Sequence, residues 1–380
     1  MTDFFKKPIA ALMALLLSAN LSFNLSSFQK KYADIDPGQY KNVILFIGDG
    51  MGYNSLYWTE KEYGVELEML TRAPIKGFSK TRSSSNAVTD SAAGGTALAC
   101  ATRTTNRAIG VFPQDRYSWA FVAMNLCELA QSYGRMAGVV TTDTNTGATP
   151  ASFSAHTDDR GNGEIISHQQ IEQSDLDLIW SAKSGFVSEE YANQYGWTYL
   201  DSKADFEALE EGERSFAQFE GEIWREESGA DSPTLSAMTA KAIDMLDDDP
   251  DGFFLMVEGA HIDKNSHSNN SEGMTAAAME FNRAINWAYD YADQNGDTLI
   301  VISADHETGG IKVDDNGNFY YTKTSHSSTD VPILVYGCDK FIQDGETIKN
   351  KEIARRLSLA MGAEIGEFPQ AISIDDYNKE

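Results

Sequence analysis

The most informative stretch for the fold is Asn42–Gly52, which reads NVILFIGDGMG. Residues 43–47 are all apolar, and a Gly-Asp-Gly turn follows them at once. A short run of this kind predicts a strand that is buried on both faces of a parallel sheet. Four more runs of the same character predict further parallel strands: Ala137–Thr141, Phe253–Val257, Thr298–Ser303 and Val331–Tyr336.

Helical patterns stand between several of these runs. We expect helices over Phe121–Tyr133, which Gly134 closes, over Leu235–Leu246 and over Met274–Ala292. Strands that alternate with helices predict an α/β fold, in which a central, largely parallel β-sheet carries helices on both faces. Residues 165–232 are acidic, aromatic and poor in clear strands, so we expect them to form a surface insertion within a single domain that spans 40–380.

The charge of the chain excludes some classes of protein. The 57 acidic and 30 basic residues give a formal net charge of −27 at pH 7. Binding of nucleic acid or of an anionic membrane through bulk electrostatics needs a basic surface, so neither is expected. Hydrophobic residues make up 42% of the 380 residues, which is enough for a large core and argues against disorder. The acidic surface favours solubility and suits a saline habitat.

The N-terminus has the pattern of a secretory signal peptide. Lys6 and Lys7 precede the apolar run Ile9–Leu17, which is too short to span a bilayer, and polar residues follow it. We expect a signal peptide over residues 1–22, with Ala19 or Ser22 as candidates for the cleavage site. A buried first helix is the alternative interpretation. The signal predicts a periplasmic or secreted protein without stable membrane association.

The cysteines do not predict a disulfide framework. Cys100, Cys127 and Cys338 are widely separated and form no CxxC pair. An odd number of cysteines without regular spacing favours no disulfide of structural importance, even in an oxidising compartment. Cys127 lies in an apolar helical pattern and is expected to be in the core.

Acidic residues and histidines follow the predicted strands in a pattern that indicates a metal site. Directly after strands stand Asp49, Glu258, Asp305 and His306, and close to them in sequence or motif lie Asp263, His267 and His326. Ligands bind at the carboxyl ends of strands in an open parallel sheet, so these groups are expected to converge. Carboxylates mixed with imidazoles suit zinc, and oxygen ligands alone suit magnesium. Any one of these residues alone is more typical of a helix cap or a solvated pair.

A serine and an arginine supply the other chemistry. Ser91 lies in the first turn of a helix that Thr89 or Asp90 caps, where backbone N–H groups favour an anion. A free serine is a weak nucleophile, and with no histidine nearby in sequence, activation by a metal is the natural option. The alternative is a small-residue helix packed on the sheet. Arg160 can bind a phosphoryl group in a bidentate manner, with Asp158 or Asp159 to orient it.

These motifs, taken together and in this order, resemble the alkaline phosphatase family from about Asn42 to Gly337. The motifs are DGMG (49–52), TDSAAGGTA (89–97), ATPASFSAH (148–156) with Arg160 after it, VEGAHIDKNSH (257–267), ADHETGG (304–310) and SHSSTDVP (325–332). The resemblance implies hydrolysis of phosphate monoesters through a phosphoserine, an alkaline pH optimum, two zinc ions, one magnesium ion and a homodimer.

The resemblance also implies a role for each site residue. Ser91 corresponds to the nucleophile, Arg160 to the residue that clamps the phosphate oxygens, and Lys264 to a residue that contacts phosphate through water. The implied ligands are Asp263, His267 and His326 for the first zinc, Asp49, Asp305 and His306 for the second, and Asp49, Thr149 and Glu258 for magnesium. His156, His168 and His261 are expected to be structural, with His261 close to the metals.

Gly147 departs from the family pattern. Two residues before Thr149 the family commonly has an acidic residue or a histidine that supports the magnesium, and glycine has no side chain. We expect a more hydrated third site, weaker binding of magnesium and an enzyme that responds to added magnesium. Asn145 or Asp143 are candidates to replace the missing group through a shift of the loop.

Three other functions fit parts of the sequence. A sibling hydrolase on the same metal scaffold would cleave phosphodiesters or sulfate esters, although Arg160 beside a serine nucleophile favours monoesters. The glycines of 48–52 resemble a dinucleotide-binding turn, but Asp49 within it would repel a pyrophosphate. A metal- or phosphate-binding protein without catalysis is the third alternative.

Overall fold

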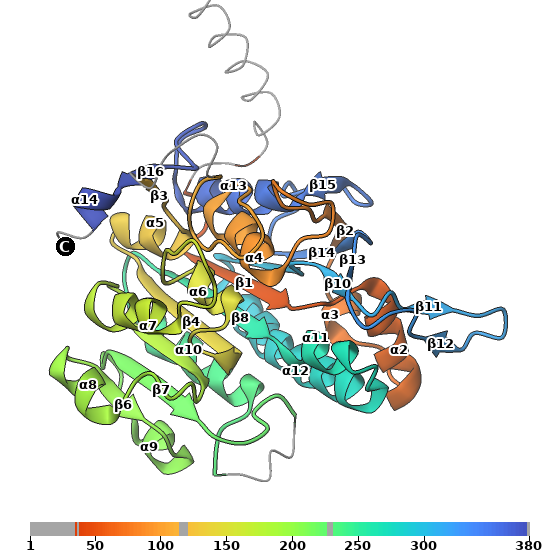
Figure 1. Cartoon of the computed structure of the whole chain (residues 1–380), viewed down its shortest axis with the longest axis horizontal. Coiled ribbons are helices and arrows are strands. Elements are labelled where there is room, and N and C mark those ends of the chain that lie inside the picture. Colours follow the sequence, from red (N-terminus) through yellow and green to blue (C-terminus); the bar gives the residue numbers. More distant parts are fainter. Residues whose placement is uncertain (1–34, 36–37, 114–120, 226–230, 378–380) are drawn as a thin grey trace, which may run out of the picture.

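The apolar run that begins at Asn42 forms β1 (Asn42–Gly48), a central strand of the main sheet in this computed structural model (Figure 1). The structure describes residues 35, 38–113, 121–225 and 231–377. The other strands of this sheet are β2 (Ile75–Lys80), β4 (Met136–Thr144), β5 (Leu178–Ala182), β6 (Thr198–Leu200), β7 (Ser215–Phe219), β8 (Phe253–Gly259), β9 (Thr298–Ser303), β14 (Val331–Tyr336) and β15 (Thr347–Lys349). Their spatial order is β15-β2-β14-β9-β1-β8-β4-β5-β7-β6.

The sheet is largely parallel, as predicted. All pairs from β9 through β1, β8, β4, β5 and β7 to β6 are parallel. One predicted strand was assigned the wrong direction, because β14 runs antiparallel to both β9 and β2. An apolar run indicates burial on both faces but does not specify direction. A parallel pair needs a crossover connection, usually a helix, whereas residues 304–330 between β9 and β14 form only short strands and loops.

We expected residues 165–232 to form a surface insertion with few strands. The structure shows instead that this segment belongs to the central sheet. It contributes β5, β7 and β6, which extend one edge of the central sheet. The helices α7 (Gly163–Glu172), α8 (Glu189–Gln194) and α9 (Lys203–Ala208) lie in the same segment. The sequence did not predict β6 because it has only three residues. It did not predict β7 because the polar residues Ser215 and Gln218 reduce its apolar character.

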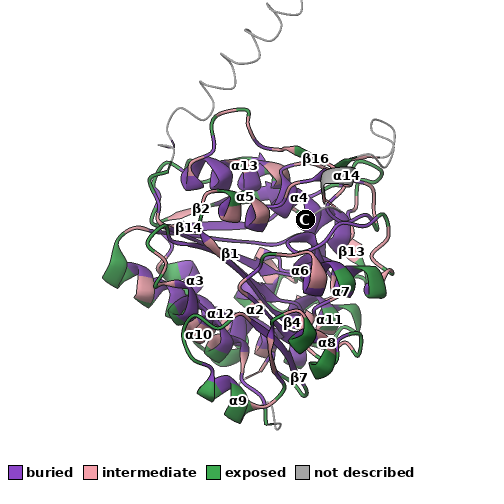
Figure 2. Cartoon of the chain, turned by 90° about the vertical axis from the view of Figure 1, so that its left-hand side faces the viewer, coloured by how far each residue is buried: buried purple, intermediate pink, exposed green. Residues whose placement is uncertain are grey.

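Helices cover both faces of the sheet, and the strands are buried between them (Figure 2). Side chains alternate along β1, so Ile44 and Phe46 join one core cluster, while Val43, Leu45 and Ile47 join the other. The first cluster includes residues of α2 (Tyr53–Tyr63), α3 (Glu68–Thr71), α9, α10 (Leu235–Leu246) and α12 (Ser271–Asn295). The second includes residues of α4 (Ser91–Cys100), α5 (Leu126–Ser132), α7, α8 and α13 (Asn350–Met361). Burial on both faces explains the continuous apolar runs.

Two of the three predicted helices are confirmed. Leu235–Leu246 matches α10, and Met274–Ala292 lies within α12. The helix expected over 121–133 is only partly right, because β3 (Phe121–Ala123) precedes α5. Asn125 starts α5 by a capping box, in which its Oδ1 accepts from the N–H groups of Cys127 and Glu128 and Glu128 Oε2 accepts from Asn125 N.

The remaining elements are short. They are α6 (Ala148–Ser152), α11 (His261–His267), β10 (Glu307–Thr308), β11 (Lys312–Val313), β12 (Phe319–Tyr320), β13 (His326–Ser327), β16 (Ala371–Ser373) and α14 (Ile374–Tyr377). Strands β11 and β12 form a hairpin that projects from the body of the molecule (Figure 1). In contrast, α11 and β10 lie beside the turn that follows β1, since Gly50 lies against Asp263 and Gly52 against Glu307, and β13 pairs with β10.

The three cysteines are buried with free thiols, as expected for a chain without a disulfide framework. Cys127 belongs to the second core cluster. Within the described residues, no helix combines the length and the apolar character needed to cross a membrane. The predicted signal peptide at 1–22 lies outside the described residues.

Candidate active site

The carboxyl ends of three neighbouring strands bring the predicted acidic residues to one edge of the sheet. β1 lies between β8 and β9, with Ile47 opposite Glu258 on one side and Ser303 on the other. Asp49 and Asp305 therefore follow adjacent strands, and both carboxylates are buried together with Glu258. This is the position at which open α/β sheets bind ligands.

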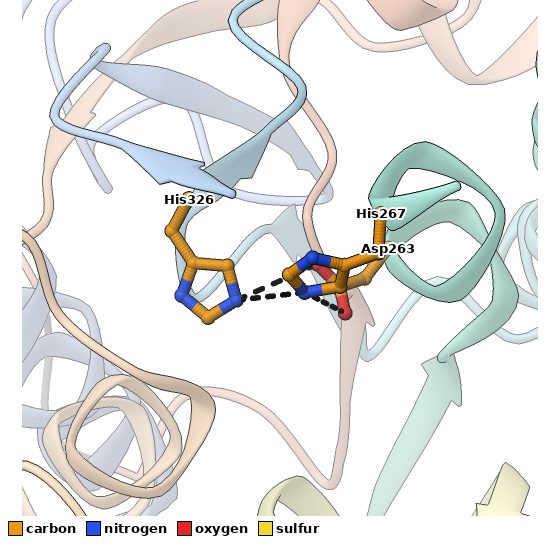
Figure 3. A group of neighbouring side chains, drawn as sticks. All are labelled: Asp263, His267 and His326. Carbon is orange, nitrogen blue, oxygen red and sulfur yellow. Dashed lines mark hydrogen bonds and ion pairs between the residues drawn. The ribbon is translucent and has the colours of Figure 1, made fainter. Parts of the chain in front are cut away.

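Asp263, His267 and His326 form the first candidate cation site (Figure 3). Asp263 and His267 are one turn apart on α11, so they share one face of that helix, and His326 reaches them from β13. His267 Nε2 lies 3.3 Å from Asp263 Oδ2 and 3.1 Å from His326 Nε2. One candidate ligand atom from each residue lies within 4.8 Å of the other two.

Hydrogen bonds on the far side of the imidazoles determine which nitrogen faces this site. The Nδ1 atoms of His267 and His326 contact the carbonyl oxygens of Thr324 and Thr89, at 2.7 and 3.0 Å. Because a carbonyl oxygen can only accept a hydrogen bond, both Nδ1 atoms carry a hydrogen and donate a hydrogen bond. Without a proton or a cation between them, the Nε2 lone pairs of the two rings and the carboxylate of Asp263 would face one another and repel. A shared cation removes this repulsion, and the donor set fits zinc.

The carboxylate of Asp263 also affects the protonation of the first site. Its hydrogen bond raises the pKa of His267 to about 9. A proton on His267 therefore relieves the repulsion when no cation does. Protons and a cation would compete for the same inward-facing nitrogen, so cation binding at this site releases protons.

Asp49, Asp305 and His306 form the second candidate cation site, which is fully buried. His306 Nε2 lies 3.2 Å from Asp305 Oδ2 and 3.5 Å from Asp49 Oδ1. Neither of these carboxylate oxygens has a hydrogen-bond partner among the described residues. Burial and then neighbouring carboxylates raise the pKa of Asp49 and of Asp305, and burial lowers the pKa of His306. A divalent cation would lower the pKa of both carboxyls and would bind the unprotonated His306 ring that burial already favours, so the residues fit one.

Two further buried oxygens, on Glu258 and Thr149, are candidates to bind a third cation. Glu258 and Thr149 are buried, and Glu258 Oε1 and Thr149 Oγ1 have no hydrogen-bond partner in the described part of the chain. Thr141 donates to the other oxygen of Glu258. Burial, and then the charge of Asp143, raise the pKa of Glu258 to about 8. The charge of Glu258 contributes to the raised pKa of Asp49, and carboxylate and hydroxyl oxygens are donors of the kind that magnesium prefers.

Ser91 begins α4 and lies against the second candidate site. Its Oγ atom is 3.2 Å from His306 Nε2. The ring of His306 stacks on that of His326 with centroids 3.5 Å apart, so the first and second sites adjoin. Asp90 caps the helix, since its Oδ1 accepts from Ala93 N at 3.0 Å. The free N–H groups of a first helical turn and the helix dipole favour an anion beside Ser91.

The structure corrects the predicted partner of Arg160. We expected Asp158 or Asp159 to orient its guanidinium, but Asp159 accepts hydrogen bonds of 2.7 and 3.1 Å from Arg107. Arg160 Nη1 instead lies 3.7 Å from Asp90 Oδ2. Because Asp90 also caps α4, one carboxylate aligns both Arg160 and the helix that carries Ser91. An acid so distant in sequence from Arg160 becomes its partner only through packing.

Lys264 and the other histidines surround these groups. Lys264 forms an ion pair with Asp143, at the carboxyl end of β4. His156 and His168 each pair with a glutamate, at 2.8 and 3.0 Å, and neither belongs to a candidate cation site. His261 stacks on Trp224 with ring centroids 5.0 Å apart, and burial lowers its pKa to about 3. His261 thus stays neutral near the site.

Sequence reasoning missed Thr308. Its hydroxyl donates to Asp263 Oδ1 and lies 3.3 Å from His306 Nδ1, so it contacts one member of each of the first two candidate sites. The signal was its position two residues after His306. In an extended segment, residues two apart point to the same side, and a hydroxyl there can support both ligands.

Comparison with known proteins places this arrangement in a family. The alkaline phosphatase family matches residues 40–180 and 183–357, and the chain belongs to that family. It is 34% identical to the alkaline phosphatase of Schizosaccharomyces pombe, over 80% of this chain and 62% of the yeast protein. The chain therefore spans about three fifths of the length of that relative. Alkaline phosphatase 4 of Bacillus subtilis is 28% identical, over 98% of this chain and 84% of that protein.

A solved structure agrees with the fold. The alkaline phosphatase from the Antarctic bacterium TAB5 has a TM-score of 0.74 and 30% identity, over 87% of this chain and all of the other. A mutant of the TAB5 enzyme, with a TM-score of 0.74, 28% identity and the same coverage, has Mg bound in a site designated M3. These similarities confirm the predicted α/β fold class.

Proposed function

We propose that this chain hydrolyses phosphate monoesters to an alcohol and inorganic phosphate, with Ser91 as nucleophile and an alkaline pH optimum. The observation that carries the proposal is the position of Ser91 Oγ, 3.2 Å from His306 Nε2 at the start of α4. A hydroxyl in this place adjoins two groups of metal-binding side chains and a helix end that favours an anion. Membership of the alkaline phosphatase family supports the same activity.

The proposal includes two zinc ions and one magnesium ion. Asp263, His267 and His326 would hold the first zinc, Asp49, Asp305 and His306 the second, and Asp49, Thr149 and Glu258 the magnesium. When bound, the zinc ions stabilise negative charge on the attacking and leaving oxygens and lower the pKa of a bound water. The Mg bound by the TAB5 mutant supports the third cation.

The chain's own groups act at each step of the proposed reaction. Ser91 Oγ loses its proton to solvent and attacks phosphorus, the bond to the ester oxygen breaks, and the leaving oxygen takes up a proton from solvent and departs as the alcohol. Water then loses a proton to solvent and attacks the phosphorus of the phosphoserine. The bond to Ser91 Oγ breaks, Ser91 regains a proton from solvent, and phosphate leaves. Arg160 and the N–H groups of the first turn of α4 bind the non-bridging oxygens through both displacements. Lys264 contacts the phosphate through water.

Two consequences follow from this sequence of steps. Two successive in-line displacements leave the configuration at phosphorus unchanged overall. The rate rises with pH, because Ser91 attacks as an alkoxide and water as hydroxide. Export to the periplasm or the medium and assembly as a homodimer complete the proposal; export rests on the N-terminal sequence pattern and the homodimer on the family resemblance.

Hydrolysis of p-nitrophenyl phosphate by the purified protein tests the function. We expect hydrolysis that a chelator abolishes and that zinc with magnesium restores. Ser91→Ala is expected to lower kcat about a thousandfold or more, while Ser132→Ala at the end of α5 serves as a matched control with normal activity. Mass spectrometry after an acid quench is expected to find phosphate on Ser91.

Other substrates distinguish this function from its alternatives. Bis(p-nitrophenyl) phosphate and p-nitrophenyl sulfate are expected to react much more slowly, since a dianionic terminal phosphoryl group uses both Arg160 and the first turn of α4. If the diester or the sulfate ester were hydrolysed faster than the monoester, the proposed function would be wrong. The chain would then be a phosphodiesterase or a sulfatase. Undiminished activity of Ser91→Ala would contradict the phosphoserine mechanism.

A further inference from the structure

The structure gives a reason for the glycine at position 147. Gly147 precedes α6 with φ −54° and ψ 147°, a conformation open to ordinary residues. A Cβ atom added there would lie 2.5 Å from Asp143 Oδ2 and 2.7 Å from Asp143 Cγ. The carboxylate of Asp143 thus fills the space that a side chain at 147 would need. Glycine is required by this contact and not by backbone strain.

Several contacts hold Asp143 in that space. Its backbone N–H donates to Thr141 Oγ1 at 2.8 Å, and the same hydroxyl donates to Glu258. Its Oδ1 accepts from Thr144 N at 2.8 Å and from Lys264 Nζ. Only 18% of the Asp143 side chain is exposed, compared with 43% for Lys264. Asp143 is therefore connected to Glu258 through one hydroxyl and cannot move away freely.

Asn145 is excluded as the replacement for a side chain at 147. Its Nδ2 donates to Gln170 Oε1 at 2.7 Å and to Ser167 Oγ at 3.1 Å, both on α7. Its Oδ1 accepts from Gln218 Nε2 at 2.9 Å. Both ends of this buried amide are hydrogen-bonded to α7 and β7. Of Asn145 and Asp143, only Asp143 therefore remains as a candidate to replace a side chain at position 147.

We propose that Asp143 supplies to the third cation site the carboxylate that is absent at position 147, and that Lys264 holds it there. This proposal rests on the proposed function and assigns a positioning residue to the magnesium site. The buried oxygens of Glu258 and Thr149 that lack partners among the described residues mark the site itself. The negative charge of Asp143 acts on this site, since it contributes to the raised pKa of Glu258.

The proposal changes the expectation for magnesium. A glycine at 147 alone would leave a more hydrated and weaker site. With Asp143 in place, the negative charge near the cation is kept, and it comes from β4 instead of the start of α6. Groups that support metal ligands in this way typically change metal affinity by about 10- to 100-fold when they are removed.

Calorimetric titration of the zinc-loaded protein with Mg²⁺ tests this role without measuring activity. Asp143→Asn is expected to raise the Kd for Mg²⁺ by about 10- to 100-fold. Glu220→Gln, which removes an exposed carboxylate 2.7 Å from Lys183, is the matched control and is expected to leave the Kd unchanged. Thermal unfolding of each zinc-loaded variant checks that it is folded.

Moving the carboxylate from position 143 to position 147 tests whether Asp143 acts on the cation or only stabilises the fold. Gly147→Asp alone is expected to weaken Mg²⁺ binding, because the new side chain collides with Asp143. Combined with Asp143→Ala, the same substitution is expected to restore most of the affinity. An unchanged Kd in Asp143→Asn, or a double variant that binds no better than Asp143→Ala, would overturn the proposal.

The two proposals can fail separately. If the wild type hydrolyses p-nitrophenyl phosphate but its Kd for Mg²⁺ does not depend on residue 143, the role of Asp143 is wrong and the function stands. If Mg²⁺ binding depends on Asp143 but no monoester is hydrolysed, the role of Asp143 is supported and the proposed function is wrong.

Discussion

The contacts of the ring nitrogens distinguish two kinds of histidine in this chain. In His267 and His326, Nδ1 donates to a backbone carbonyl oxygen, and Nε2 is left to face a cation. In His156, Nδ1 contacts Gly110 O at 2.7 Å and Nε2 contacts Glu128 Oε1 at 2.8 Å, so both nitrogens face acceptors. The first arrangement leaves Nε2 free to bind either a cation or a proton, and the second favours a charged ring.

The ion pair of His156 predicts a stability that depends on pH. Burial alone would lower the pKa of His156, but the charge and hydrogen bond of Glu128 outweigh burial and raise it. Its contribution is therefore complete below the unfolded pKa of about 6.5 and is lost as pH rises through the folded value. We expect Glu128→Gln to lower the free energy of unfolding by about 1–3 kcal/mol at pH 6 and by much less at pH 10.

Urea unfolding of both proteins at equal metal content measures this difference. Glu172→Gln removes the partner of the more exposed His168 and is the control, with a smaller effect at both pH values. An equal loss of stability at pH 6 and pH 10 in Glu128→Gln would show that His156 is not charged.

At the scale of elements, the site depends on helices that pack closely against the ends of strands. Helix α4 carries Ser91 at its start and passes directly beside the chain after β9, where Asp305 lies. A Cβ atom on Gly94 would lie 2.9 Å from Asp305 Cβ and 3.0 Å from its carbonyl oxygen. The small residues of α4 thus allow Ser91, the proposed nucleophile, and a candidate cation ligand to adjoin.

Substitution of Gly94 by alanine tests this packing. Alanine favours a helix over glycine by about 1 kcal/mol, but overpacking against backbone costs about 1–3 kcal/mol and displaces Asp305. We therefore expect Gly94→Ala to lose zinc on dialysis more readily than the wild type, as metal analysis would show. Gly64→Ala lies at a helix end with no neighbouring atom within 4 Å but with φ +66°, so it strains the backbone away from the site and is expected to retain zinc. Equal retention of zinc by all three proteins would contradict this account.

At the scale of the whole molecule, negative charge is distributed in two ways. All 57 acidic residues count toward the formal net charge of −27, but Asp49, Glu258, Asp263 and Asp305 are buried together. Divalent cations at the buried carboxylates would make the site locally positive within a negative protein. The distant field then repels a phosphate dianion that the site attracts.

This opposition predicts how activity depends on salt. Raising ionic strength from about 0.01 to 0.15 M shortens the Debye length from about 30 to 8 Å, which screens the distant field more than the close contacts. We expect kcat/KM for p-nitrophenyl phosphate to rise over this range. Sodium and potassium chloride should act alike if screening is the cause. A steady fall in kcat/KM would show that attraction by the site reaches further than repulsion by the surface.

Local sequence was sufficient for those features that depend on neighbours in the chain. The apolar runs that end near Asp49 and Glu258 predicted buried strands, which β1 and β8 confirm, and the ligand roles of these two acids stay predictions. The candidate cation groups came together because parallel strands in register bring their carboxyl ends to one edge. Helix caps also depend on neighbours in the chain. The sequence contains the capping box at Asn125, although we did not use it to predict the start of a helix.

Features that depend on residues distant in sequence needed the folded chain. The direction of β14 and the edge strands β5, β6 and β7 follow from connections and pairing partners, which an apolar pattern does not encode. Asp90 was identified as the partner of Arg160, and Asp143 as the group that fills the space beside Gly147, only in three dimensions. The physical reason is that side-chain contacts depend on which surfaces pack together, and packing is a property of the whole chain.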